Sequence, residues 1–106
     1  MKKLLFVCTL NLQRSPTAAE IFKDKYDTKS AGVGDTAKVP LTSELLGWAD
    51  VVFVMEGWQR KLISEKFPKL YLKKKIINLD IPDMYYFMDE ELVKVLKEKV
   101  ETSIQT

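Results

Sequence analysis

The 106-residue sequence contains no histidine and only one cysteine, Cys8. The lack of histidine excludes Ser-His-Asp and Cys-His catalysis and every histidine-based metal site. A single cysteine can form neither an internal disulfide nor a thiolate metal cluster. A cysteine-poor chain is also typical of a reducing compartment. We therefore expect a cytoplasmic protein without a histidine-based or thiolate metal site.

Long apolar runs are missing as well, since none approaches the ~18 apolar residues that span a bilayer. The first eight residues resemble the start of a signal peptide. The apolar stretch ends at Asn11, however, and Arg14 follows without a small-residue cleavage pattern. The formal net charge is only +2, which gives no argument for a nucleic-acid or membrane partner.

The composition is that of a globular domain, with 46% apolar and 30% charged residues. The length fits one domain over residues 1–106. Short apolar or β-rich runs predict strands at Leu4–Cys8, Thr28–Ala31, Val51–Met55 and Lys75–Leu79. Helical periodicity covers Pro16–Tyr26, Thr42–Ala49, Trp58–Phe67 and a last helix with Asp89 as its N-cap. This alternation predicts an α/β fold, a parallel sheet covered by helices that binds ligands beyond the carboxyl ends of its strands.

The loop after the first strand carries the chemistry. Ser15 is expected to be the N-cap of the next helix and Pro16 its first residue. The loop then ends at a helix N-terminus, whose free N–H groups and dipole attract an anion. The same environment would stabilise Cys8 as a thiolate, the nucleophilic form. Arg14 supplies a planar fork that matches two phosphate oxygens.

The pattern Cys-x5-Arg-Ser-Pro, from Cys8 to Pro16 and directly after a buried strand, resembles the low-molecular-weight protein tyrosine phosphatases. The resemblance continues in Ser30–Gly32, Trp48–Glu56 and Asp80–Tyr86. It implies a three-layer sandwich whose four-stranded parallel sheet has the order 2-1-3-4. It also implies a cysteine-dependent phosphomonoesterase that acts on phosphotyrosine proteins or small aryl phosphates without a cofactor.

The resemblance assigns roles to individual residues. Cys8 would be the nucleophile that forms a phosphocysteine, and Arg14 would bind the phosphoryl group. Asp83 would protonate the leaving phenol oxygen and then activate water. Ser15 would donate its hydroxyl to the Cys8 sulfur. Asn11 would brace the loop, because asparagine tolerates a left-handed backbone.

Further positions complete the expected site. The phosphate-binding loop would consist of Thr9, Leu10, Asn11, Leu12, Gln13 and Arg14. Tyr85 and Tyr86 would wall the pocket, or they would pack in the core. Asp80 is the alternative to Asp83 as general acid. Trp58 would border the pocket or pack elsewhere.

Three residues depart from the family pattern. Leu10 stands where the family has glycine, so its side chain should point outward. Gln13 replaces a second cysteine, and Met84 replaces a proline beside the general acid. These departures leave open a phosphate- or phosphoprotein-binding regulatory module without turnover. Arsenate reductase, which relays electrons through extra cysteines, and a cysteine phosphocarrier are further alternatives.

Overall fold

The computed structural model describes residues 1–105, and a parallel sheet forms its centre. The strands are β1 (Lys3–Cys8), β2 (Asp27–Gly32), β3 (Val51–Val54) and β4 (Lys75–Asn78). Their order is β2-β1-β3-β4, which confirms the order that the resemblance implies. Strands β1 and β3 are buried along almost their whole length, as expected for interior strands with covered faces.

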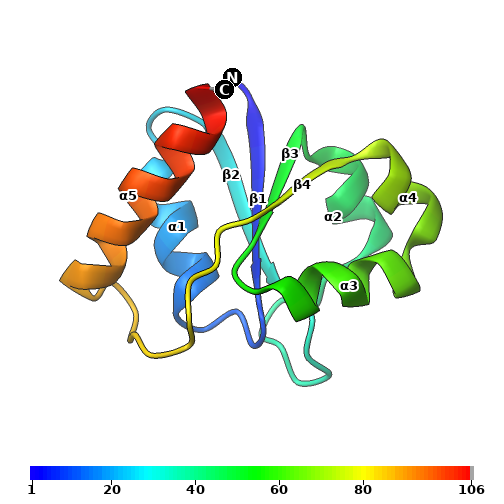
Figure 1. Cartoon of the computed structure of the whole chain (residues 1–106), viewed down its shortest axis with the longest axis horizontal. Helices are drawn as coiled ribbons and strands as arrows, with labels where there is room; N and C mark the ends of the chain where they lie inside the picture. Colours follow the sequence, from blue (N-terminus) through cyan, green and yellow to red (C-terminus); the bar gives the residue numbers. More distant parts are fainter. Residues whose placement is uncertain (106) are drawn as a thin grey trace.

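The helices cover both faces of this sheet. They are α1 (Arg14–Phe22), α2 (Ser43–Trp48), α3 (Gly57–Lys66), α4 (Pro68–Lys73) and α5 (Glu90–Gln105). Helices α1 and α5 lie on one face, and α2, α3 and α4 lie on the other (Figure 1). No helix in the described part is long and apolar enough to cross a membrane. The expected three-layer α/β sandwich is confirmed.

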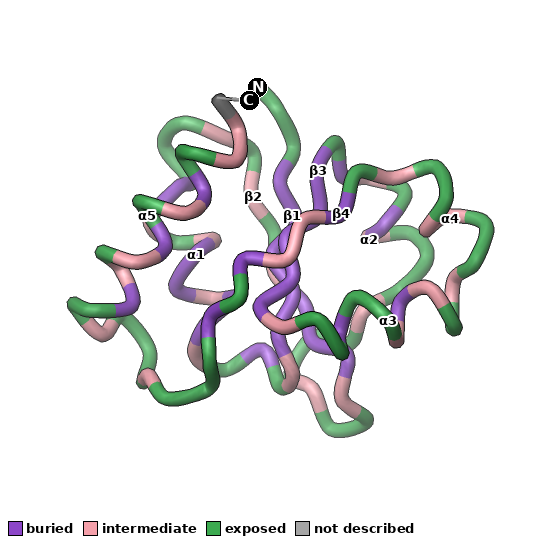
Figure 2. Tube along the Cα trace, viewed as in Figure 1, coloured by how far each residue is buried: buried purple, intermediate pink, exposed green. Residues whose placement is uncertain are grey.

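Two apolar cores result from the alternation of side chains along β1. Leu4 and Phe6 face α1 and α5, where Phe6 stacks on Phe22 with ring centroids 5.9 Å apart. Leu5 and Val7 face the opposite core beneath α2 and α3. The buried trace in Figure 2 accordingly follows the sheet and the inner faces of the helices. Both cores anchor β1, so the loop that follows it starts from a rigid strand.

The start of α1 differs from the sequence prediction. The helix begins at Arg14 with Gln13 as the N-cap, and no side chain makes a capping hydrogen bond there. The prediction that Ser15 caps the helix and that Pro16 is its first residue was therefore wrong by two positions. The physical reason is that the Ser15 hydroxyl bonds to buried groups of the loop instead. Pro16 is still tolerated, because the first turn of a helix needs no N–H donor.

The other helix boundaries agree with the prediction to different degrees. The last helix does start after Asp89, whose carboxylate accepts a hydrogen bond from the Glu91 N–H at 3.1 Å. The first helix ends at Phe22 rather than Tyr26.

Helix α4 was not predicted at all. It begins at Pro68, which suits the first turn of a helix.

Gly32 fixes how closely β2 approaches the loop after β1. It is paired with Cys8 in the β1–β2 register. A Cβ atom at this position would lie 2.6 Å from the Thr9 carbonyl oxygen and 2.7 Å from the Ala37 Cβ. Neither neighbour is the flexible end of a side chain. The loop after β1 can therefore take its observed path only beside glycine.

We expect Gly32→Ala to lower the free energy of unfolding by about 1–3 kcal/mol, because the added methyl group overpacks the loop. Gly47→Ala is the matched control, since a Cβ there meets nothing within 4 Å. It should raise stability by about 0.5–1 kcal/mol, because alanine favours the helix. Urea unfolding of both variants measures these changes. Equal stability of the two variants would contradict the tight contact.

Candidate active site

The Cys8 side chain lies at the carboxyl end of β1, where the α/β pattern placed the ligand site. It is 3% exposed, and its Sγ atom lies 3.0 Å from the Ser15 Oγ. The backbone N–H of Asn11 donates to the same sulfur at 3.3 Å. Hydrogen-bond donors beside a helix N-terminus stabilise a thiolate over a thiol. The sulfur lies within hydrogen-bond reach of the Ser15 hydroxyl and of one backbone N–H group.

Asn11 and Ser15 hold the loop together beneath this sulfur. Asn11 has a left-handed backbone with φ 60°, as the sequence predicted. Its Nδ2 donates to the Ser15 Oγ at 2.9 Å. The Ser15 hydroxyl has one proton, which can go to the Ala31 carbonyl oxygen at 3.3 Å or to Cys8. A negative sulfur is the stronger acceptor, so ionisation of Cys8 should draw this proton to it.

Several backbone N–H groups of the loop have no hydrogen-bond acceptor. Within residues 1–105, no acceptor is hydrogen-bonded to the N–H groups of Leu10, Leu12, Gln13, Arg14 and Ser15. They belong to the loop and to the first turn of α1, where such groups have no intrahelical partner. The side chains of Leu10 and Leu12 are 38% and 48% exposed, so Leu10 points outward as predicted. These donors form a cradle for an oxyanion beside the sulfur.

Arg14 is buried, with only 2% of its side chain exposed. Its Nη1 donates to the Ile81 carbonyl oxygen at 2.8 Å and to the Glu56 Oε2 at 3.0 Å. These two bonds use both N–H groups of Nη1. Its Nη2 lies 3.4 Å from the Thr9 Oγ1, a long contact. The Nε and Nη2 edge is thus the one left to grip two oxygens of a phosphoryl group.

Two residues that support Arg14 were missed as site residues by sequence reasoning. Glu56 precedes α3 and forms a reciprocal capping box with Gln59. Gln59 is fully buried, and its Nε2 donates to the Thr9 Oγ1 at 3.1 Å. It therefore joins the start of α3 to the loop after β1. The Glu-x-x-Gln spacing after a buried strand is the sequence signal that could have revealed this pair.

The structure distinguishes the two candidate acids. The Asp83 Oδ1 lies 3.7 Å from the Arg14 Nε, and its side chain is 61% exposed. Asp80 has a left-handed backbone with φ 57°, and its carbonyl oxygen accepts from the Lys99 Nζ at 2.9 Å. The Asp80 carboxylate makes no ion pair with any described residue. Of the two candidate acids, Asp83 is therefore the one whose carboxylate lies beside the Arg14 guanidinium.

The two tyrosines of the same segment occupy different environments. Tyr85 is partly buried and packs against the core beneath α1 and α5. Tyr86 is 71% exposed. Among the described residues, neither ring forms a hydrogen bond or a ring contact with the phosphate-binding loop. Of this pair, Tyr86 is the side chain with a surface free to meet a ligand.

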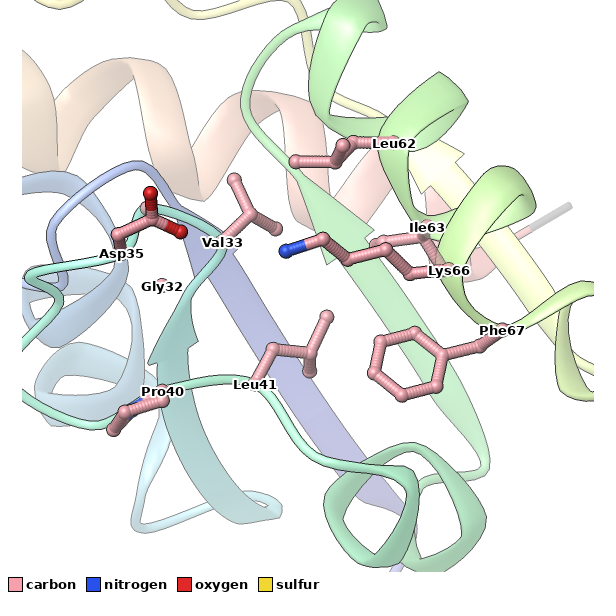
Figure 3. Close-up of a pocket in the computed structure, with 10 residues that line it drawn as sticks. Gly32, Val33, Asp35, Pro40, Leu41, Leu62, Ile63, Lys66 and Phe67 are labelled. Atoms are coloured by element: carbon pink, nitrogen blue, oxygen red, sulfur yellow. The ribbon is translucent and has the colours of Figure 1, made fainter.

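A cavity of about 210 Å³ lies elsewhere, between residues 32–41 and α3 (Figure 3). Its wall combines apolar side chains with the charged groups of Asp35 and Lys66. None of the residues predicted to be catalytic lines it. The backbone donors, the sulfur and the guanidinium all belong to the loop after β1. That loop, rather than this cavity, is therefore the candidate active site.

Comparisons with known proteins agree with this architecture. No family model and no curated protein sequence matches the chain. Among solved structures, the Streptococcus pyogenes low-molecular-weight protein tyrosine phosphatase SP-PTP has a TM-score of 0.80 at 21% identity, over 99% of this chain and 92% of that one. The chain has the fold of the low-molecular-weight protein tyrosine phosphatases.

Two further structures have the same fold. The low-molecular-weight protein tyrosine phosphatase from T. tengcongensis has a TM-score of 0.72 at 25% identity, over 95% of this chain and 94% of that one. The YwlE arginine phosphatase from Geobacillus stearothermophilus has a TM-score of 0.72 at 23% identity, over 99% and 94%. The fold thus extends across nearly the full length of each phosphatase.

We expect Glu56→Gln to lower the free energy of unfolding by about 1–3 kcal/mol, because it removes the charged partner of a buried guanidinium. It should also weaken the binding of inorganic phosphate, since Arg14 is less firmly oriented. Thermal unfolding and calorimetry measure the two effects. Glu65→Gln, on the exposed surface of the same helix, is the control. An unchanged phosphate affinity in Glu56→Gln would contradict the anchoring role.

Proposed function

We propose that the protein is a cysteine-dependent phosphatase that hydrolyses phosphotyrosine in proteins or small aryl phosphates. The observation that carries the proposal is the arrangement around Cys8. The loop after β1 carries this sulfur, five free backbone N–H groups and the Nε and Nη2 edge of Arg14. Such a loop binds a tetrahedral oxyanion directly in front of a nucleophile. The fold shared with known phosphatases supports the same assignment.

The first chemical step is transfer of the phosphoryl group to the protein. The Cys8 thiolate attacks phosphorus, so an S–P bond forms while the P–O bond to the leaving group breaks. Asp83, in its protonated form, gives its proton to the departing oxygen. Arg14 and the backbone donors hold the three other oxygens as their charge is redistributed.

The second step regenerates the protein. Asp83, now a carboxylate, takes a proton from water, whose oxygen attacks phosphorus. The S–P bond breaks, inorganic phosphate leaves, and the Cys8 thiolate is restored with the Ser15 hydroxyl as its donor. Both steps use one carboxylate as acid and then as base. No oxidant, reductant or metal enters this balance.

The rim of the site favours an aryl substrate. Leu12 from the loop and Tyr86 from the opposite segment are both well exposed and offer apolar surface. A phenyl ring gains from such contacts, whereas a charged guanidinium would lose solvation against them. We therefore propose phosphotyrosine as the substrate rather than the phosphoarginine implied by the name of the YwlE neighbour.

The partner and the compartment follow from the same chemistry. A phosphotyrosine-bearing protein would present its side chain to the open loop. The lone thiol has no second cysteine in the sequence to protect it by a reversible disulfide. We propose that the protein works in the reducing cytoplasm, where such a nucleophile persists.

Hydrolysis of p-nitrophenyl phosphate and of a phosphotyrosine peptide tests this function. Cys8→Ser should abolish turnover, because a hydroxyl is far less ionised than a thiol. Asp83→Asn should lower kcat on the peptide by about 10²–10⁴. With p-nitrophenyl phosphate, the rate of phosphoryl transfer to Cys8 should fall less, because the p-nitrophenol leaving group needs little protonation.

Asp80→Asn is the matched control for the acid, since asparagine also accepts the left-handed backbone of this position. It should retain wild-type kcat. Turnover that survives in Cys8→Ser would contradict the mechanism. Faster hydrolysis of a phosphoarginine peptide than of the phosphotyrosine peptide would overturn the substrate assignment. A wild-type protein that binds phosphate without hydrolysing it would be a binding module.

A further inference from the structure

Trp58 lies at the edge of the candidate active site. It is the second residue of α3, and its side chain is 49% exposed. Its indole Nε1 donates to the Glu56 Oε2 at 3.2 Å. The same oxygen accepts from the Arg14 Nη1 at 3.0 Å. The indole is thus separated from the phosphate-binding guanidinium by a single carboxylate oxygen.

The guanidinium has a different segment on its other side. Arg14 Nε lies 3.7 Å from Asp83, which belongs to the segment between β4 and α5. Glu56, which precedes α3, contacts a different nitrogen of the same guanidinium, so this segment and the start of α3 both adjoin the loop after β1 (Figure 1). Trp58 and Tyr86 therefore belong to two different segments that flank the same loop, and both side chains are exposed.

The hydrogen bond to Glu56 restricts how the indole can turn. A tryptophan whose N–H is held at one edge keeps its ring faces free for stacking. About half of the side chain remains exposed, although burial of an aromatic ring is strongly favourable. A rigid and accessible ring beside an anion site suits a substrate that carries a planar group on its phosphate.

We propose that Trp58 is a specificity-determining residue that stacks on the ring of an aryl phosphate. The inference rests on the proposed function, because an aryl phosphate is the substrate proposed there. The stacking contact forms when the ligand binds, so it can be measured without turnover. Trp58 should contribute little to recognition of the phosphate group itself, which the loop and Arg14 provide.

Binding of two phosphonates isolates the ring contact. Phenylphosphonate and methylphosphonate share the anionic head and differ in the aromatic ring, and neither is hydrolysed. In Trp58→Leu, the affinity for phenylphosphonate should fall about three- to tenfold, and that for methylphosphonate should stay unchanged. Trp58→Phe should restore most of the phenylphosphonate affinity, because it returns a ring without the N–H. Leu72→Ala, on the far surface of α4 and 85% exposed, should match the wild type.

Other outcomes would overturn the inference. If Trp58→Leu and Trp58→Phe both weaken methylphosphonate binding, Trp58 acts through Glu56 and Arg14 rather than through stacking. If the ratio of the two affinities is the same in Trp58→Leu and wild type, or if neither phosphonate binds the wild type, the ring contact does not exist. A protein that shows the predicted ratios but hydrolyses no phosphate ester would refute the proposed function alone.

Discussion

The site depends on one buried cation, Arg14, whose orientation is fixed from behind. Both N–H groups of Nη1 are used by the Ile81 carbonyl and by Glu56. A guanidinium held by these two bonds cannot rotate toward other acceptors. Its Nε and Nη2 edge therefore stays directed at the loop. Burying this charge in a largely apolar protein is costly unless it is paired and hydrogen-bonded. The hydrogen bonds to this charge therefore hold together the start of α1, the residue before α3 and the segment after β4.

The order of the strands brings the groups of the site to one edge of the sheet. Strand β1 delivers Cys8, β3 delivers Glu56, and the segment after β4 delivers Asp83. All three lie at or beyond the carboxyl ends of parallel strands, which meet at one edge of an open α/β sheet. Gly32 lets β2 approach the loop closely enough to support it. Sheet topology thus brings together groups that are far apart in the sequence.

The local part of the site was predictable from sequence. Cys8, Asn11, Ser15 and Arg14 lie within eight residues of one another, so strand, loop and helix signals determine their arrangement. The helix start was wrong because the Ser15 hydroxyl bonds to Cys8 and Asn11 rather than to the backbone of the first turn, which a capping rule does not consider. The partners of Arg14 were missed for a different reason, because Glu56 and the Ile81 carbonyl lie 42 and 67 residues away in the chain. Strand order followed from the family resemblance rather than from the apolar pattern.

The most direct test of the account is capture of the covalent intermediate. Asp83→Asn should form it readily from p-nitrophenyl phosphate, whose leaving group departs without an acid, and should hydrolyse it slowly for want of a base. The intact mass of the rapidly quenched protein should then increase by one phosphoryl group, located on Cys8 by fragmentation. An unmodified protein that still releases p-nitrophenol, or a phosphoryl group found on any other residue, would contradict a phosphocysteine mechanism.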